Sequence, residues 1–248
     1  MELKFQGAAY HGWQRQDGIP TVQQVIEDQI LILTPNARFH LIGCSRLDAR
    51  VSANQYFALL VIDEEILNCE RFVEKLNQIL PSDIEILNLK IQSQKLSLIS
   101  DAKKKIYQYH FVDQSNLIQD SVLNCSVFKE QLNLDLMREG ARMFEGTKSF
   151  HNYCYRPKKD QNFIRKIEYF RLKISTREDL VNPVHFFEIE GEGFMRYQIR
   201  LMIGTLINLS NKKITLTDIE SSFNPDFKKQ IAFAVPANGL ILEKIELS

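Results

Sequence analysis

The order in which helical and strand-like segments follow one another constrains the fold of this chain more than any other feature. Apolar residues of 22–33 recur at helical spacing after Thr21, whose position fits a helix N-cap, and Pro35 ends the segment. The stretch 37–45 alternates in polarity as a strand does. The stretch 54–63 is almost uniformly apolar from 56 to 62, which is typical of a strand covered on both faces. Between these two strands lies a short polar loop.

The remainder of the chain continues the alternation without an internal repeat. We expect helices and strands at 69–79 (helix), 106–112 (strand), 130–144 (helix), 184–194 (strand), 194–210 (helix) and 240–245 (strand). The segments lack the glycine fingerprint and the tight strand–helix spacing of a nucleotide-binding sheet. They therefore predict an α+β fold in which the sheet is mainly antiparallel.

Composition excludes several other classes of protein. With 248 residues, 44% of them hydrophobic, the chain can bury a core without disulfides or metal. No apolar run is long enough to cross a bilayer, and the first residues lack the apolar core of a signal peptide, so we expect a cytoplasmic protein. The four cysteines are far apart and predict reduced thiols rather than a zinc site.

The charges of the chain give opposing indications about a nucleic-acid partner. Lys and Arg number 31 and Asp and Glu number 31, and a net charge of zero counts against a nucleic-acid partner. The basic residues are unevenly spread, however. Residues 103–105 are three consecutive lysines, and 156–166 holds five basic side chains against one aspartate. One basic face is compatible with this distribution, although such runs are more often solvated surface.

The polar loop between the first two apolar strands carries the clearest candidate for chemistry. Asp48 stands there between Arg46 and Arg50. Neighbouring positive charge keeps a carboxylate ionised, which suits a nucleophile or an electrostatic partner better than a general acid. The alternative interpretation is a turn aspartate in a solvated ion pair.

Other candidates lie in the second half of the chain. Tyr107 and Tyr109 alternate along a predicted strand that follows the lysine run, so they could stack on a base or could be half-buried strand residues. Arg196 and Arg200 fall one turn apart on the predicted helix 194–210. On an otherwise apolar face, Arg200 either pairs with an acid in a cleft or extends to water. The segment around Trp13 is either an RNA-contacting loop or a packed turn.

Taken in order, eight segments resemble the TruA family of transfer-RNA pseudouridine synthases. The sequence SRLDARVSA at 45–53 is similar to the family's G-R-T-D-A-G-V-H-A, and FMRYQIRLMIG at 194–204 is similar to F-x-x-x-x-V-R-x-M-V-G. The other six segments are 5–14, 21–23, 80–84, 102–109, 144–150 and 236–240. Arg50 stands where the family has glycine, so a positive φ there would strain the loop.

The resemblance implies a fold, a reaction and a set of site residues. It implies two similar α/β halves that meet at a basic cleft, 1–100 with the Asp loop and 101–248 with the Tyr strand and Arg helix. It implies isomerisation of uridine to pseudouridine in transfer RNA, in the anticodon stem-loop, by a homodimer without cofactor or metal. Asp48, Tyr107 and Arg200 would be catalytic, and the substrate-binding residues would be Arg46, Tyr109, Lys103, Lys105 and Arg196.

Two other functions stay open from the sequence alone. A protein that kept the fold but lost the chemistry would bind RNA without modifying it, and the altered loop around Asp48 motivates this alternative. A structural dimerisation protein with no RNA partner is the second alternative, and an evenly mixed charge surface would favour it.

Overall fold

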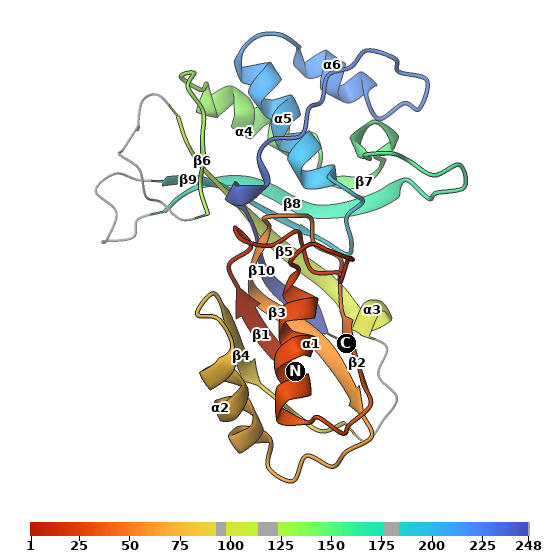
Figure 1. The fold of residues 1–248 in the computed structure, drawn as a ribbon. Coiled ribbons are helices and arrows are strands. Elements are labelled where there is room, and N and C mark those ends of the chain that lie inside the picture. Colours follow the sequence, from red (N-terminus) through yellow and green to blue (C-terminus); the bar gives the residue numbers. More distant parts are fainter. Residues whose placement is uncertain (93–97, 114–123, 176–183, 248) are drawn as a thin grey trace. The chain divides into compact units, whose positions relative to one another are not determined.

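The computed structural model describes residues 1–92, 98–113, 124–175 and 184–247. The chain forms two compact units, which we call unit 1 (Met1–Lys103 and Ile241–Ser248) and unit 2 (Lys104–Leu240). Both contain antiparallel strands with helices packed beside them (Figure 1). The α+β class with a mainly antiparallel sheet, predicted from the segment order, is confirmed.

Unit 1 is built around one long central strand. Its strands follow the order β4 (Ile84–Asn88), β1 (Glu2–Phe5), β3 (Ser52–Ile62) and β10 (Leu240–Leu247), and β2 (Phe39–Gly43) also pairs with β3. The β10–β3 pairing is parallel and the others are antiparallel. Helices α1 (Val22–Leu33), α2 (Cys69–Ile79) and α3 (Leu98–Asp101) complete the unit, with α1 against β2 and α2 against β4.

The helix predicted after Thr21 is confirmed, since α1 begins at Val22 and the Thr21 hydroxyl accepts a hydrogen bond from the Gln24 N–H at 3.4 Å. The expectation that 54–63 is covered on both faces is wrong for its second half, where Val61 is 49% exposed. A run of apolar residues shows strand propensity but does not show what covers each face, and here β2 pairs beside the strand without covering it.

Unit 2 is also built on hydrogen-bonded strands with helices stacked beside them (Figure 1). The strand order is β5 (Ala102–Val112), β9 (Val184–Gly191), β8 (Ile164–Ser175) and β7 (Gly146–Ser149), all antiparallel. The short strand β6 (Ser126–Val127) pairs with β5 in parallel. Helix α4 (Leu134–Arg142) packs on both α5 (Gln198–Ser210) and β8. The remaining elements are η2 (His151–Tyr153), α6 (Leu216–Ser221) and η3 (Ala237–Gly239).

Helix α5 begins four residues later than its hydrophobic pattern predicts. Tyr197 has a left-handed φ of 63°, and the chain before it makes a turn in which the Gln198 side chain accepts from the Met195 N–H at 2.9 Å. This turn satisfies the backbone without a helical hydrogen bond. The prediction that Arg196 and Arg200 lie one helical turn apart is therefore wrong, because Arg196 precedes the helix.

The last strand also differs from its predicted place. The sequence-based division put residues 240–245 with the second half, whereas β10 pairs with β3 in unit 1 through Ile241 opposite Ser52 and Leu242 opposite Ala53. This pairing joins residues 189 positions apart in the sequence, and hydrophobic periodicity carries no information about such distant partners. No helix in the described ranges is long and apolar enough to cross a membrane.

Candidate active site

The loop that carries Asp48 is fixed to the segment that follows β1. The Arg50 N–H donates to the Tyr10 carbonyl at 3.0 Å, and the Leu47 carbonyl accepts from the Trp13 N–H at 3.4 Å. Within the loop, the Val51 N–H donates to the Asp48 carbonyl at 3.2 Å. The backbone around Asp48 is thus held on both sides by hydrogen bonds, as a preorganised catalytic group requires.

Two glycines allow this close approach. A Cβ on Gly12, which has a φ of +92°, would lie 2.4 Å from the Leu47 carbonyl oxygen. A Cβ on Gly7 would lie 2.1 Å from the Val51 carbonyl oxygen, and the Gly7 N–H donates to the Ser52 Oγ at 2.9 Å. Any larger residue at either position would push the Asp48 loop away. The glycines of segment 5–14 therefore shape the loop.

A third segment, which leads into β4, is bonded to segment 5–14. The Tyr10 hydroxyl donates to Asp83 Oδ1 at 2.6 Å, and the Asp83 carbonyl accepts from the Gln6 N–H at 2.8 Å. Burial and the adjacent Asp83 carboxylate raise the pKa of Tyr10 far above its ordinary value, so its hydroxyl remains a donor. Segment 80–84 is therefore bonded to segment 5–14, which is bonded in turn to the Asp48 loop.

Beneath the loop lies an aromatic cluster. Trp13 is 1% exposed, and its ring centroid is 4.2 Å from that of Tyr56. The Tyr56 hydroxyl donates to the Ser45 carbonyl, where the loop begins. Trp13 is therefore part of a packed turn, which decides between the two interpretations that the sequence left open for this residue.

The loop exposes its charged residues to different degrees. Asp48 is half-buried, whereas Arg46 and Arg50 are exposed. Arg50 has a φ of 68°, so the left-handed conformation considered for this position is present, and it carries a side chain where glycine is favoured. The loop thus offers one partly shielded carboxylate with a cationic residue two positions away on either side.

In unit 2, the two predicted tyrosines are both buried, with 5% of Tyr107 and 0% of Tyr109 exposed, but their contacts differ. Tyr107 faces Ile189 of β9 and packs edge-on against Phe194, with ring centroids 5.3 Å apart. Tyr109 is fully buried, and its hydroxyl donates to Ser126 Oγ at 2.8 Å and to the Pro236 carbonyl at 3.0 Å. Because burial raises the pKa of Tyr109 and its hydroxyl is engaged, this residue packs the unit.

The lysine run 103–105 alternates along the start of β5. Lys103 is exposed at the end of unit 1, while Lys104 and Lys105 are half-buried in unit 2. Lys104 Nζ lies 3.4 Å from Glu190 Oε1 on the neighbouring strand β9. The charge of Lys104 is therefore partly neutralised by Glu190.

Arg200 is fixed in the first turn of α5 by two groups of its own unit. Its Nε donates to the Val235 carbonyl at 2.8 Å, and its guanidinium carbon lies 4.4 Å from the centroid of the Tyr197 ring. The side chain is half-buried, and the planar guanidinium is held in one orientation. This arrangement presents a rigid cation.

A pair of stacked tyrosines, which the sequence analysis did not single out, lies beside Arg200. The rings of Tyr155 and Tyr197 are 4.6 Å apart with an interplanar angle of 20°. Arg196 lies 5.1 Å from the first ring and 5.4 Å from the second. The only sequence sign of this cluster is the density of Arg and Tyr in two distant segments, because their contact depends on tertiary structure.

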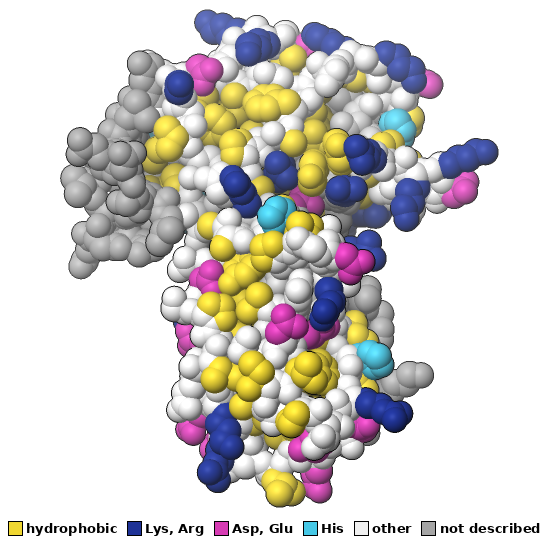
Figure 2. Space-filling model, in the orientation of Figure 1, with side chains coloured by type: hydrophobic (Ala, Val, Ile, Leu, Met, Phe, Trp, Pro, Cys, Tyr) yellow, Lys and Arg dark blue, Asp and Glu magenta, His cyan; other side chains and the backbone are white. Residues whose placement is uncertain are grey.

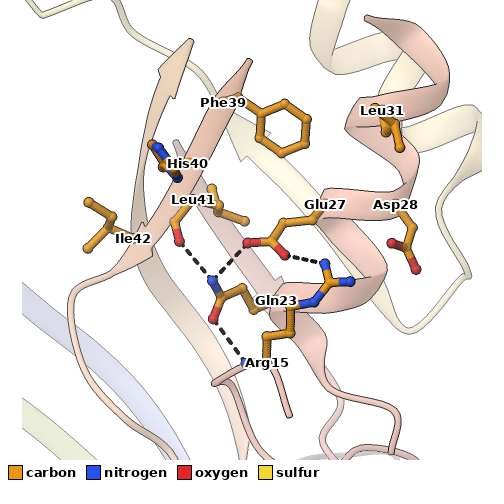
Figure 3. A pocket seen from close by; sticks show the side chains of 9 residues that line it. All are labelled: Arg15, Gln23, Glu27, Asp28, Leu31, Phe39, His40, Leu41 and Ile42. Atoms are coloured by element: carbon orange, nitrogen blue, oxygen red, sulfur yellow. Dashed lines mark hydrogen bonds and ion pairs between the residues drawn. The ribbon is translucent and has the colours of Figure 1, made fainter. Parts of the chain in front are cut away.

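Unit 1 also contains a hollow of about 500 Å³ between α1 and β2, shown in Figure 3. Its polar groups satisfy one another. The Gln23 amide donates to the Leu41 carbonyl at 2.9 Å and to Glu27 at 2.8 Å, and Arg15 pairs with Glu27 at 2.8 Å. This network ties the helix to the strand. Among the described residues, no group of His, Cys, Asp and Glu could hold a metal ion.

Comparison with known proteins places the chain in a family. A family model described as tRNA pseudouridine synthase matches residues 141–247. A protein of Clostridium acetobutylicum named tRNA pseudouridine synthase A is 30% identical over 248 residues, which cover 99% of this chain and 97% of that protein. The chain belongs to the tRNA pseudouridine synthase A family. The resemblance drawn from the eight sequence segments is thereby confirmed.

Two other known proteins are similar to the chain, one in sequence and one in structure. The tRNA pseudouridine synthase A of Clostridium botulinum (strain Alaska E43 / Type E3) is 29% identical over 243 residues, covering 98% of this chain and 96% of that protein. A chain in the crystal structure of a Cbf5–Nop10–Gar1 complex aligns with a TM-score of 0.38 at 12% identity, over 98% of this chain and 48% of that chain. Membership in the tRNA pseudouridine synthase A family rests on the sequence relatives.

Proposed function

We propose that this protein isomerises uridine to pseudouridine in transfer RNA, the activity for which its relatives are named. The observation that carries the proposal is the loop of the half-buried Asp48, whose backbone is hydrogen-bonded to Tyr10 and Trp13 and is closely approached by two glycines. A loop fixed this rigidly around one carboxylate is typical of a catalytic site.

The reaction is an internal exchange of bonds at one nucleotide. The bond between N1 of uracil and C1′ of the ribose breaks, the base rotates, and a bond between C5 and C1′ forms. N1 gains a proton and C5 loses one, so atoms and electrons balance without an oxidant or a cofactor. Asp48 acts either as the nucleophile or as the base that removes a ribose proton.

We assign the other two catalytic roles to residues of unit 2. Arg200 holds a fixed positive charge that would stabilise the Asp48 carboxylate and the charge that develops as the glycosidic bond breaks. Tyr107 would stack on the target uracil and take part in removing the C5 proton.

Binding of the substrate requires the target uridine to leave its stack. This costs a few kcal/mol and least where the nucleotide is unpaired. We therefore place the target in the anticodon stem-loop, and assign phosphate contacts in the basic cleft to Arg46, Lys103, Lys105 and Arg196. Tyr109 is left out of the proposed contacts because its hydroxyl is bound to Ser126 and to the Pro236 carbonyl within unit 2.

Two further properties belong to the proposal. We expect a homodimer, because the resemblance to the TruA family implies that one transfer RNA spans two subunits. We also expect the protein in the cytoplasm, where transfer RNA is present. The four cysteines are free thiols, as is usual in a reducing compartment.

Mapping of pseudouridine in unmodified transfer-RNA transcripts tests the function. After incubation with the purified protein, we expect new pseudouridine at uridines of the anticodon arm and none in the transcript alone. Tight binding without any pseudouridine would instead support an RNA-binding protein that lost the chemistry. Absence of both binding and modification would favour a purely structural role.

A further inference from the structure

Five residues of unit 2 form a continuous arrangement of rings and guanidinium groups, which we call the tyrosine–arginine stack. Its members are Tyr155, Arg156, Arg196, Tyr197 and Arg200. The two rings stack at 4.6 Å, and guanidinium carbons lie 4.4 to 5.4 Å from ring centroids. All these separations fall within the range of effective cation–π contact.

The backbone fixes this arrangement from two distant parts of the chain. The Tyr155 N–H donates to the Arg196 carbonyl at 3.0 Å, which joins the loop after η2 to the turn before α5. Tyr197 and Arg156 both adopt left-handed conformations, with φ of 63° and 50°. Such conformations cost free energy and are found where the surrounding structure requires them, often at functional sites.

The outer end of the stack carries charge that no carboxylate neutralises. Arg156 and Arg196 are exposed, and within the described part of the chain neither lies within 4.0 Å of an Asp or Glu oxygen. Two lysines of β8 in the same unit are paired instead: Lys166 with Glu168 at 2.6 Å and Lys173 with Glu188 at 2.6 Å. Unpaired guanidinium groups beside aromatic rings suit a polyanion that also offers flat apolar faces.

The neighbourhood is basic as well. Lys158 and Lys159 follow in the same loop and are exposed. Figure 2 shows Lys and Arg side chains close together over the part of unit 2 that contains β7, β8 and the loop between them. In a chain of zero net charge, this concentration marks a surface with a positive potential.

We propose that the tyrosine–arginine stack binds one unpaired nucleotide of the RNA substrate. Tyr155, which is 36% exposed, offers the base a stacking surface, and Arg156 and Arg196 bind its phosphate. The inference deepens the proposed function and rests on it for the identity of the polyanion. Because Arg200 ends the same stack, a nucleotide on Tyr155 lies near the catalytic arginine and helps to seat the neighbouring target.

Affinity for RNA, measured with oligouridylate and with an unmodified transfer-RNA transcript, tests the stack separately from turnover. Tyr155→Ala should weaken binding of both RNAs by about fivefold or more, since stacking of one base is lost. Tyr155→Phe keeps the ring and should stay within about twofold of the original protein. Arg156→Ala should lower the slope of log affinity against log salt by about one.

A matched control is available on the same unit. Tyr169 also has a guanidinium over its ring, since the guanidinium carbon of Arg171 lies 4.9 Å from the ring centroid. Tyr169 lies beside Glu188, however, and burial and this carboxylate both raise the pKa of the Tyr169 hydroxyl. An acidic neighbour disfavours RNA, so Tyr169→Ala should leave affinity unchanged. Thermal melting of each variant reports whether unit 2 remains folded.

The outcomes separate the two proposals. If Tyr155→Ala is folded and binds oligouridylate as well as the original protein, the stack is not a nucleotide site, whatever the enzyme does to uridine. A loss of the same size in Tyr169→Ala would also overturn it. If the original protein forms no pseudouridine but Tyr155→Ala still loses affinity, the stack stands and the catalytic proposal fails.

Discussion

Arg50 has a backbone conformation that destabilises the loop that contains it. Its φ of 68° places the Cβ in a crowded left-handed conformation, while its N–H is bound to the Tyr10 carbonyl at 3.0 Å. The side chain itself is exposed. The loop therefore holds Arg50 in a strained conformation, and the stability of unit 1 includes this cost.

Replacement of Arg50 by glycine should relieve the strain. Arg50→Gly should raise the free energy of unfolding by about 0.5–1 kcal/mol, because relief of left-handed strain exceeds the entropy that glycine adds to the unfolded chain. Arg50→Ala is the control: it removes the charge but keeps the Cβ, so no gain is expected. Urea denaturation measures both, and a glycine variant no more stable than the alanine variant would contradict the strain.

Tyr107 offers a second prediction about a single residue. Tyr107→Phe keeps the ring and its edge-on contact with Phe194, so RNA affinity should be unchanged. If the hydroxyl takes part in proton removal from C5, turnover should fall about 100-fold. Single-turnover formation of pseudouridine measures this, with Tyr169→Phe as the control. Undiminished turnover would leave Tyr107 with a stacking role alone.

Residue types and their spacing were enough to predict several features of the site. Asp48 between two arginines and the resemblance around it predicted the loop, and the glycine of the family's motif raised the question of a positive φ at position 50, which is present. The same reasoning could not find Tyr155 and Tyr197, because their contact joins segments 42 positions apart by number and follows from the turn before α5. A hydrophobic pattern in the sequence gives information about local structure only, and not about contacts between distant segments.

At the scale of elements, the contact between segment 5–14 and the Asp48 loop is the feature on which the site depends. Gly12 and Gly18 both have positive φ, +92° and +75°, but only Gly12 is crowded. A Cβ on Gly12 would lie 2.4 Å from the Leu47 carbonyl, whereas nothing lies within 4 Å of a Cβ on Gly18. A side chain at position 18 would therefore meet backbone strain alone, whereas one at position 12 would meet backbone strain and also clash with the Asp48 loop.

This pair gives a matched prediction. Gly18→Ala should cost about 1 kcal/mol of stability from backbone strain alone. Gly12→Ala should cost at least about 2 kcal/mol more, because the new methyl group displaces the loop, and pseudouridine formation should fall with it. Denaturation and activity are measured on both variants. Equal stability losses would show that Gly12 does not hold the Asp48 loop.

Element prediction succeeded where the periodicity was long and failed at the ends. Helices α1 and α2 match the predicted 22–33 and 69–79. The pattern of 194–210 continued through the turn before α5, because apolar residues that pack a turn have the same spacing as those of a helix. Helix starts depend on backbone conformations such as that of Tyr197, which sequence periodicity does not show.

At the scale of the whole molecule, the chain returns to its first unit at its end. β10 completes the sheet of unit 1 beside β3, and Leu242 is fully buried there. Ser52 and Ala53, which pair with β10, directly follow the Asp48 loop. The C-terminal strand therefore supports the candidate site from the opposite end of the sequence, an arrangement that no local pattern could reveal.

A chain that ends at Gly239 should lose this support. Its β3 amides should exchange with solvent much faster than in the full chain, and the Asp48 loop should become mobile. A chain that ends at Glu246 is the control, since it keeps Ile241, Leu242 and Ile245. Hydrogen exchange followed by mass spectrometry gives both results. Unchanged protection of β3 in the shorter chain would show that β10 is dispensable.

The central claim is that the carboxylate of Asp48 performs the chemistry. The most direct measurement is single-turnover release of tritium from C5-labelled uridine in transfer RNA by Asp48→Asn, with RNA affinity measured on the same sample. We predict a rate at least about 1,000-fold lower with affinity unchanged, while Asp28→Asn, an exposed carboxylate of α1, behaves as the original protein. Normal release by Asp48→Asn would contradict the account.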